Sequence, residues 1–259
     1  LWISSESTPP SRAIGHCARR RQTRLMRILP VLSLGVLLSA SAWALPTLPL
    51  QFNDQLDSVD PNDVIGDPLK FEITSLTFTS LANTVLQMDI RFNYGGGSTL
   101  AGFLNSTGAV TLNVGDLFFI TGGQTYAVIL NGHNGLQTNG LYSITSRDTA
   151  QTVLGNPSGI NYRNNALVWA SASGATLLSN GSRNINVVGG PTELLASLTI
   201  NLTPTVLANL NNGFDFYFAS ATCGNDEIFG TVSGGVPEPG TWALMGAGLV
   251  GLGLLRRRR

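Results

Sequence analysis

Two residues of this 259-residue sequence, a histidine and a cysteine, are of the types that nucleophilic catalysis uses. His133 lies in a glycine-flanked segment, 131–135, and Cys223 follows an apolar segment at 214–221. A cysteine beside a histidine can act as an activated nucleophile. Neither residue stands in a recognisable nucleophile motif, however, and two such ligands are too few for a zinc site. We therefore interpret His133 as a solvated turn residue and Cys223 as a small hydrophobe, and we predict no catalytic residue.

Aspartates recur every three or four residues between the N-terminal region and the first predicted strand. Carboxylate oxygens on a loop are the ligands that Ca²⁺ prefers, but the order of an EF-hand loop and its closing glutamate are absent. The sequence leaves two interpretations open, a calcium site and a solvated acidic linker, and it favours the linker. The candidate ligands are Asp54, Asp57, Asp60 and Asp63, followed by Asp67.

Asp226 and Glu227 are a second pair of carboxylates, of the kind that a glycoside hydrolase uses. Adjacent residues of a strand point to opposite faces, so these two cannot flank one glycosidic bond. A partner would have to come from elsewhere, and the sequence selects none among Asp89, Asp116, Asp148 and Asp215. Aromatic side chains that could stack on a sugar are favoured as core residues instead: Trp169, Tyr126, Tyr142 and Tyr162.

The segments that would position these residues have the patterns of β-strands. Apolar and polar residues alternate through 84–94 and 194–203, and 214–220 has phenylalanine at every second position at its start. Weaker strands are predicted at 70–78, 109–114, 117–121, 126–130, 141–145, 167–170, 176–178 and 185–188, separated by glycine-rich turns. This spacing predicts an all-β fold, a single antiparallel β-sandwich or jelly roll at 45–235. One short helix is predicted at 204–210, capped by Thr203.

Positive and negative charges balance over the whole chain but not along it. The 15 Lys and Arg equal the 15 Asp and Glu, yet residues 45–235 hold five cations against thirteen carboxylates, a net charge of −8. Only 18 of these 191 residues are charged, where an average globular domain has roughly 25%. Such a composition is typical of secreted β-rich proteins. An acidic surface also makes nucleic acid an unfavourable partner.

The N-terminal region has the pattern of an export signal. Met26 and Arg27 precede an apolar run that ends before the small-residue site Ala42-Trp43-Ala44. This order predicts a secretory signal peptide at 26–44 that is cleaved after Ala44. Residues 1–25 are then interpreted as an upstream mis-start or an unstructured segment. Cys223 would be the one cysteine of the mature chain, so no internal disulfide is expected.

The C-terminal region has the pattern of a membrane anchor. Pro237, Glu238 and Pro239 precede an apolar run that begins at Trp242, and Arg256, Arg257, Arg258 and Arg259 end the sequence. Residues 240–255 approach the length of a transmembrane helix once snorkelling arginines are counted. The positive-inside rule places the arginines in the cytoplasm and residues 45–239 on the far side of the inner membrane.

The last 24 residues closely resemble the PEP-CTERM sorting signal of Gram-negative bacteria. The resemblance rests on the Pro-Glu-Pro motif, the glycine-rich apolar helix and the terminal arginine cluster, in that order. It implies that an exosortase, a membrane-embedded cysteine transpeptidase, recognises and processes the chain. It also implies delivery to the cell surface or to extracellular polysaccharide. It implies no activity for residues 45–235, because such signals are attached to many unrelated domains.

These patterns together predict an exported, non-enzymatic protein with a structural or binding role at the cell surface. Exosortase, the inner membrane and extracellular polysaccharide are the expected partners, and no cofactor is expected unless Ca²⁺ binds the aspartate loop. Two alternatives stay open: a carbohydrate-binding or adhesive module, and a polysaccharide-active hydrolase.

Overall fold

The computed structural model describes residues 48–54, 67–105, 108, 110–155, 162–190, 192–234 and 246. The segments between 48 and 234 belong to one compact unit, Ala42–Pro239. Almost all of their regular structure is antiparallel β-sheet, which confirms the predicted all-β class.

Five strands form the first large sheet, in the order β1-β2-β3-β13-β12. Neighbouring strands of this sheet run antiparallel throughout. Along β3 the buried and accessible positions alternate, with Leu86, Met88, Ile90 and Phe92 buried. The strand bounds are β1 Leu50–Asn53, β2 Ile73–Ala82, β3 Val85–Asn93, β13 Glu193–Asn201 and β12 Ser182–Gly189.

Six strands form the second large sheet, in the order β11-β8-β7-β6-β14-β15. Its centre is β6, in which Leu117, Phe118 and Phe119 are all buried, so both faces of this sheet are covered. The strand bounds are β11 Thr176–Asn180, β8 Gly140–Ile144, β7 Gln124–Val128, β6 Leu117–Thr121, β14 Gly213–Ala219 and β15 Glu227–Ser233.

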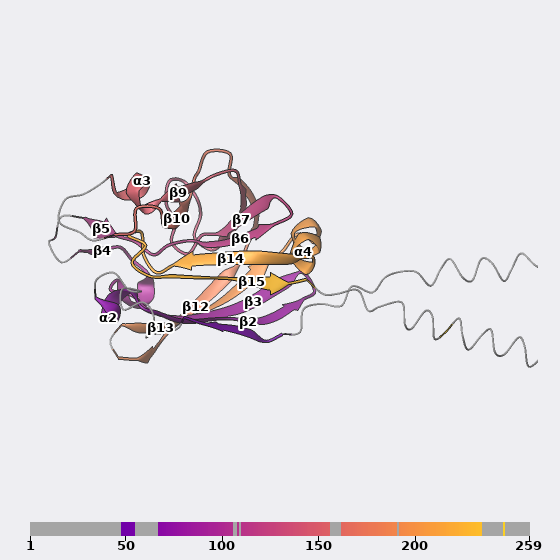
Figure 1. Cartoon of the computed structure of the whole chain (residues 1–259), viewed down its shortest axis with the longest axis horizontal. Helices are drawn as coiled ribbons and strands as arrows, with labels where there is room; N and C mark the ends of the chain where they lie inside the picture. The colour runs from indigo at the N-terminus through magenta and orange to yellow at the C-terminus, as the bar shows by residue number, and fades with distance from the viewer. Residues whose placement is uncertain are drawn as a thin grey trace, which may run out of the picture. The chain divides into compact units, whose positions relative to one another are not determined.

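The two sheets share one hydrophobic core (Figure 1). Phe78 of β2 lies with its ring centroid 5.3 Å from that of Phe214 and 5.3 Å from that of Phe216, both on β14. Phe92 of β3 contacts Phe218 of β14 in the same way, at 5.5 Å. Such edge-to-face pairs suit the quadrupoles of the rings and add to the burial of their apolar surface. Aromatic contacts between β2, β3 and β14 therefore join the sheets.

A smaller layer, which we call the outer layer, covers the other face of the six-stranded sheet (Figure 1). It contains β9 (Arg147–Thr149), α3 (Ala150–Leu154) and β10 (Leu167–Ala170), with β9 and β10 paired. Phe118 of β6 and Ala170 of β10 belong to the hydrophobic cluster beneath this layer. The layer brings residues that are distant in sequence next to the outer face of β6.

The helix α4 (Pro204–Asn211) connects β13 of one sheet to β14 of the other. The Oγ1 of Thr203 accepts a hydrogen bond from the backbone N–H of Val206, and Pro204 occupies the first turn, where its missing N–H costs no helical hydrogen bond. The predicted helix and its cap are thus confirmed.

Several strands begin or end where the sequence predicted, and others were missed. β6 and β10 match their predicted ranges, and β3, β13 and β14 differ from theirs by one or two residues at each end. The predicted strand 70–78 begins wrongly, because Pro68–Phe71 form the short helix α2, whose first turn is capped by Asp67. The predicted strand 109–114 is reduced to β5 (Thr111–Leu112), which pairs with β4 (Phe103–Leu104). The sequence analysis did not predict β1, β4, β9, β15, α3 or the 3₁₀ helix η1 (Gly97–Thr99).

Candidate functional site

The outer layer brings an aspartate, a histidine and a tryptophan together. Asp116 directly precedes β6, His133 lies in the turn after β7, and Trp169 lies on β10. The backbone N–H of Asp116 donates to the carbonyl of Val168 at 2.8 Å, which fixes β10 beside the start of β6. Local sequence patterns did not indicate this cluster, because its members lie 17 and 36 residues apart along the chain.

Asp116 and His133 form a buried hydrogen-bonded pair. The Nε2 of His133 lies 2.8 Å from Oδ2 of Asp116, and their side chains are 6% and 0% exposed. The backbone N–H of Ala170 also donates to Oδ2, at 2.8 Å. Burial raises the pKa of Asp116, while the hydrogen bond from His133 opposes that rise. The predicted solvated turn at His133 is wrong, because the turn folds back onto a buried carboxylate.

Trp169 completes the cluster and holds the imidazole in place. Its ring is stacked on that of His133, with centroids 4.1 Å apart and planes within 6°. Its Nε1–H donates to the carbonyl of Val114 at 3.2 Å. Nδ1 of His133 is itself buried, so neither ring nitrogen faces solvent. This arrangement suits a clasp that holds the 131–139 turn against the sheet better than it suits a proton-transfer site.

Cys223 lies in the turn between β14 and β15 and is buried in the core shared by the two large sheets. Burial raises the pKa of its thiol to about 12, so the thiolate is scarce at neutral pH. His133 has Asp116 as its side-chain partner and belongs to the outer layer. The geometry gives no support to a pairing of Cys223 with His133.

Asp226 and Glu227 have separate structural partners. Asp226 is fully buried, and its carboxylate accepts hydrogen bonds from the backbone N–H groups of Ile73 and Glu227. It therefore anchors the start of β2 to the turn before β15. Glu227 forms an ion pair with Arg163, with 3.7 Å between Oε2 and Nη1.

The other carboxylates proposed as partners are dispersed. Asp116 is committed to His133, and Oδ1 of the exposed Asp215 accepts from the hydroxyl of Thr231 at 2.6 Å. Asp89 lies on β3 in the other sheet, and Asp148 lies on β9. None of these four carboxylates, all within the described residues, is a hydrogen-bond partner of Asp226, which is held by backbone N–H groups instead.

The aspartates considered as candidate calcium ligands are described only at the two ends of their segment. Asp54 follows β1, and its backbone N–H donates to the carbonyl of Thr74. Asp67 caps α2 and pairs with Lys70 at 3.4 Å. Asp57, Asp60 and Asp63 lie outside the described residues. Within the described ranges, no group of three or more His, Cys, Asp or Glu side chains is placed to hold a metal ion.

The tyrosines proposed as sugar-stacking residues are used in packing. The hydroxyl of Tyr126 accepts from Nδ2 of Asn209 at 2.7 Å, and that of Tyr142 accepts from the backbone N–H of Gln137 at 2.9 Å. Both rings are buried, and Tyr162 is partly buried against the core.

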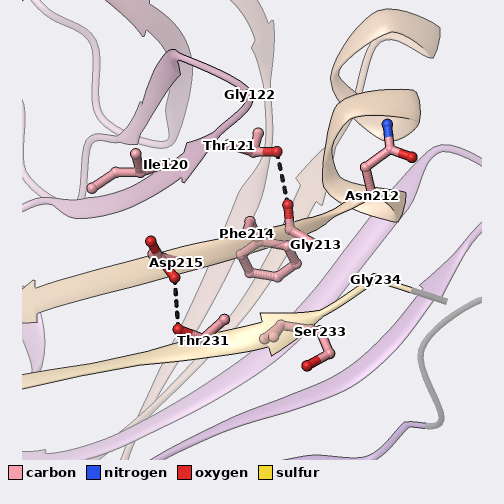
Figure 2. Close-up of a pocket in the computed structure, with 11 residues that line it drawn as sticks. Ile120, Thr121, Gly122, Asn212, Gly213, Phe214, Asp215, Thr231, Ser233 and Gly234 are labelled. Atoms are coloured by element: carbon pink, nitrogen blue, oxygen red, sulfur yellow. Dashed lines mark hydrogen bonds between the residues drawn. The ribbon is translucent and has the colours of Figure 1, made fainter. Parts of the chain in front are cut away.

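A hollow of about 410 Å³ lies where β6 ends, β14 begins and β15 ends (Figure 2). Thr121 closes one side of it, because its Oγ1 donates to the carbonyl of Gly213 at 2.7 Å. Asp215 and Thr231 line another side through their own hydrogen bond. Sequence reasoning missed this hollow, since β15 was not predicted.

Comparison with known protein families matches residues 235–259 to the PEP-CTERM protein-sorting motif. The chain carries a PEP-CTERM sorting signal. The resemblance found in the sequence is confirmed, and the PEP-CTERM signal identifies the chain as an exported protein that exosortase sorts to the cell surface. No curated protein and no solved structure matches the chain.

The individual residues predicted within the two terminal signals lie outside the described residues. They are Ala42 and Ala44 at the signal-peptide cleavage site, and Pro237, Glu238, Pro239, Trp242, Arg256, Arg257, Arg258 and Arg259 in the PEP-CTERM signal. Among the described helices, none has both the length and the apolar character needed to cross a membrane.

Proposed function

We propose that residues 45–235 form a non-enzymatic β-sandwich domain with a structural or binding role in the extracellular polysaccharide of a Gram-negative bacterium. The observation that carries the proposal is the PEP-CTERM signal at 235–259, since it directs the chain to the surface. The core shared by two antiparallel sheets supports the sandwich arrangement.

The composition and the described side chains support a role without catalysis. A domain with few charges and a net charge of −8 is wetted mainly by amides and hydroxyls, and it would not attract nucleic acid. The candidate catalytic groups are engaged in the fold: Asp116 with His133, Asp226 with backbone N–H groups, and Cys223 in the core. An exported domain built in this way can serve as a stable unit of a matrix.

The route to the surface completes the proposal. The signal peptide at 26–44 would direct export and be removed after Ala44, and the helix at 240–255 would hold the chain in the inner membrane. The terminal arginines would stay in the cytoplasm until exosortase acts at the Pro-Glu-Pro motif. The chain released from the membrane would then lose both basic ends.

The experiment that tests the proposed function is C-terminal peptide mapping of the protein in its host, with and without exosortase. Protein from the surface fraction of the competent host should lack Arg259, while protein from the exosortase-deficient host should keep Arg259 and stay with the membrane. A double variant, Pro237→Ala with Pro239→Ala, should behave in the competent host as the wild type does without exosortase. Pro204→Ala, a proline change outside the signal, is the matched control and should be processed normally.

Two outcomes would contradict the proposal. Intact Arg259 in surface material of the competent host would exclude sorting by exosortase. Shortening of the isolated matrix polysaccharide by the surface-released protein would exclude a non-enzymatic role.

A further inference from the structure

The outer face of β15 carries an aromatic side chain that the core does not use. Phe229 is 70% exposed, although both of its neighbours along β15 turn toward the inside of the sandwich. Ile228 is buried there, and Gly230 lies against the rings of Phe52 and Phe216, where an added Cβ would come within 2.9 Å of each. Inward and outward positions therefore alternate along β15, and the side chain of Phe229 points away from the core toward solvent.

Two aromatic residues on β14 and β6 lie in register with Phe229. Phe229 pairs in register with Tyr217 of β14, and Tyr217 pairs with Phe118 of β6. The rings of Tyr217 and Phe118 lie 6.4 Å apart, and the hydroxyl of Tyr217 accepts from the backbone N–H of Leu167 at 3.2 Å. Tyr217 is thus held at its hydroxyl and beside its ring, and Phe229 lies next to it in register on the edge strand β15.

Polar pairs flank these aromatic residues on both sides along the strands. On one side Thr231 donates to Asp215 at 2.6 Å, and on the other Glu227 pairs with Arg163 at 3.7 Å. Glu227 and Thr231 are each two residues from Phe229 on the same face, a spacing of about 6.6–6.8 Å. We call the residues Glu227, Phe229 and Thr231 of β15, with Asp215 and Tyr217 of β14, the Phe229 face.

The hollow described above continues from one end of this face. Asp215 and Thr231 belong to both the Phe229 face and the lining of the hollow, so the two adjoin at this end of the strands. Figure 2 shows the Asp215–Thr231 hydrogen bond beside Ser233, at the end of β15.

We propose that the Phe229 face, together with this hollow, binds a neutral polysaccharide chain. The apolar C–H face of a sugar ring matches an exposed aromatic ring, and sugar hydroxyls match the carboxylate and hydroxyl groups on either side. A purely apolar partner would remove water from the exposed Asp215 carboxylate, and the one hydrogen bond from Thr231 would only partly replace it. A polyanion would be repelled by a domain of net charge −8. The inference deepens the proposed function and rests on it for the setting in which the chain meets polysaccharide.

The test is native gel electrophoresis of the protein released from the surface of its host, in gels that contain hydroxyethyl cellulose, dextran or alginate. At least one of the two neutral polymers should slow the wild type, and alginate should slow it less. Phe229→Ala should raise the dissociation constant by about tenfold or more, as expected for an aromatic residue at the centre of an interface. Phe229→Trp should bind at least as tightly as the wild type.

The matched control is Val187→Ala, because Val187 is 55% exposed on the edge strand β12 of the other sheet. Val187→Ala should bind as the wild type does. Asp215→Ala should weaken binding by about two- to tenfold through loss of a hydrogen bond. Thermal melting of every variant shows whether the fold is kept. If Phe229→Ala alters the fold, the binding of Phe229→Trp still tests the inference.

Four results would overturn the inference. In the first, neither neutral polymer retards the protein. In the second, the wild type and Phe229→Ala are retarded equally, and in the third, alginate retards the wild type more than the neutral polymers do. In the fourth, the wild type self-associates without any polymer and Phe229→Ala does not. The last would assign the face to a second copy of the chain.

C-terminal processing keeps this test separate from the proposed function, since Phe229→Ala should lose the terminal arginines like the wild type. Processed protein that fails to bind would refute the inference alone, whereas unprocessed protein would refute the proposed function.

Discussion

At the residue scale, the Asp116–His133 pair shows how a charge can be kept inside a β-rich domain. A buried carboxylate loses its hydration, and it is tolerated here because His133 and the N–H of Ala170 replace the lost water. The sequence did contain a signal for Asp116, a single charge between the apolar stretches around Val114 and Phe118. It contained none for the partner, because glycines around His133 indicate only a turn.

Substitution of His133 should therefore lower the free energy of unfolding more than substitution of a neighbouring residue in the same turn. His133→Ala would leave Asp116 without its side-chain partner and Trp169 without its stacked ring, and we expect the free energy of unfolding to fall by about 3–5 kcal/mol. Gln137→Ala, at an exposed position of the same turn, should change it by less than about 0.5 kcal/mol. Urea denaturation measures both, and equal effects would show that the pair does not stabilise the fold.

At the element scale, strict alternation of apolar and polar residues predicted strands reliably, whereas a glycine within a strand hid the pattern. The long alternating segments predicted β3 and β13 almost to the residue. β15 has the same alternation, but its inward position between Ile228 and Val232 is Gly230, and a glycine contributes no apolar side chain to the pattern. Only the approach of Phe52 and Phe216 explains why that position must be small.

The cap of α4 gives the prediction that belongs to this scale. Thr203→Ala removes the oxygen that accepts from the N–H of Val206, and we expect a loss of about 1 kcal/mol in the free energy of unfolding. Thr205→Ala makes the same chemical change two residues later, at an exposed position inside the helix. It should have no effect or stabilise slightly, because alanine has the higher helix propensity. Guanidinium denaturation compares the two, and a loss no greater for Thr203→Ala than for Thr205→Ala would argue against the cap.

At the scale of the whole molecule, the sequence was most informative where function depends on order along the chain. The PEP-CTERM signal is such a feature, because its parts are adjacent in sequence and need no fold to be recognised. The Phe229 face is the opposite case. It needs β15 beside β14 and β14 beside β6, and the pairing of β14 with β6, a strand far away in the sequence, cannot be derived from local periodicity. The neutral charge of the whole chain was likewise uninformative until its basic ends were separated from an acidic domain.

The packing of one sheet on the other predicts that the same substitution destabilises the fold strongly at one site and hardly at all at another. Phe78 is 1% exposed and contacts Phe119, Phe214 and Phe216 across the core. Phe78→Ala should lower the free energy of unfolding by about 3–5 kcal/mol, since it removes a large buried side chain and leaves a cavity between the sheets. Phe229→Ala deletes the same atoms at a 70% exposed position and should cost less than about 0.5 kcal/mol. Chemical denaturation of both variants measures the difference, with Phe78→Leu as a milder change should Phe78→Ala fail to fold. Similar losses at both positions would mean that Phe229 is packed like a core residue, and the binding face would then not be free to accept a ligand.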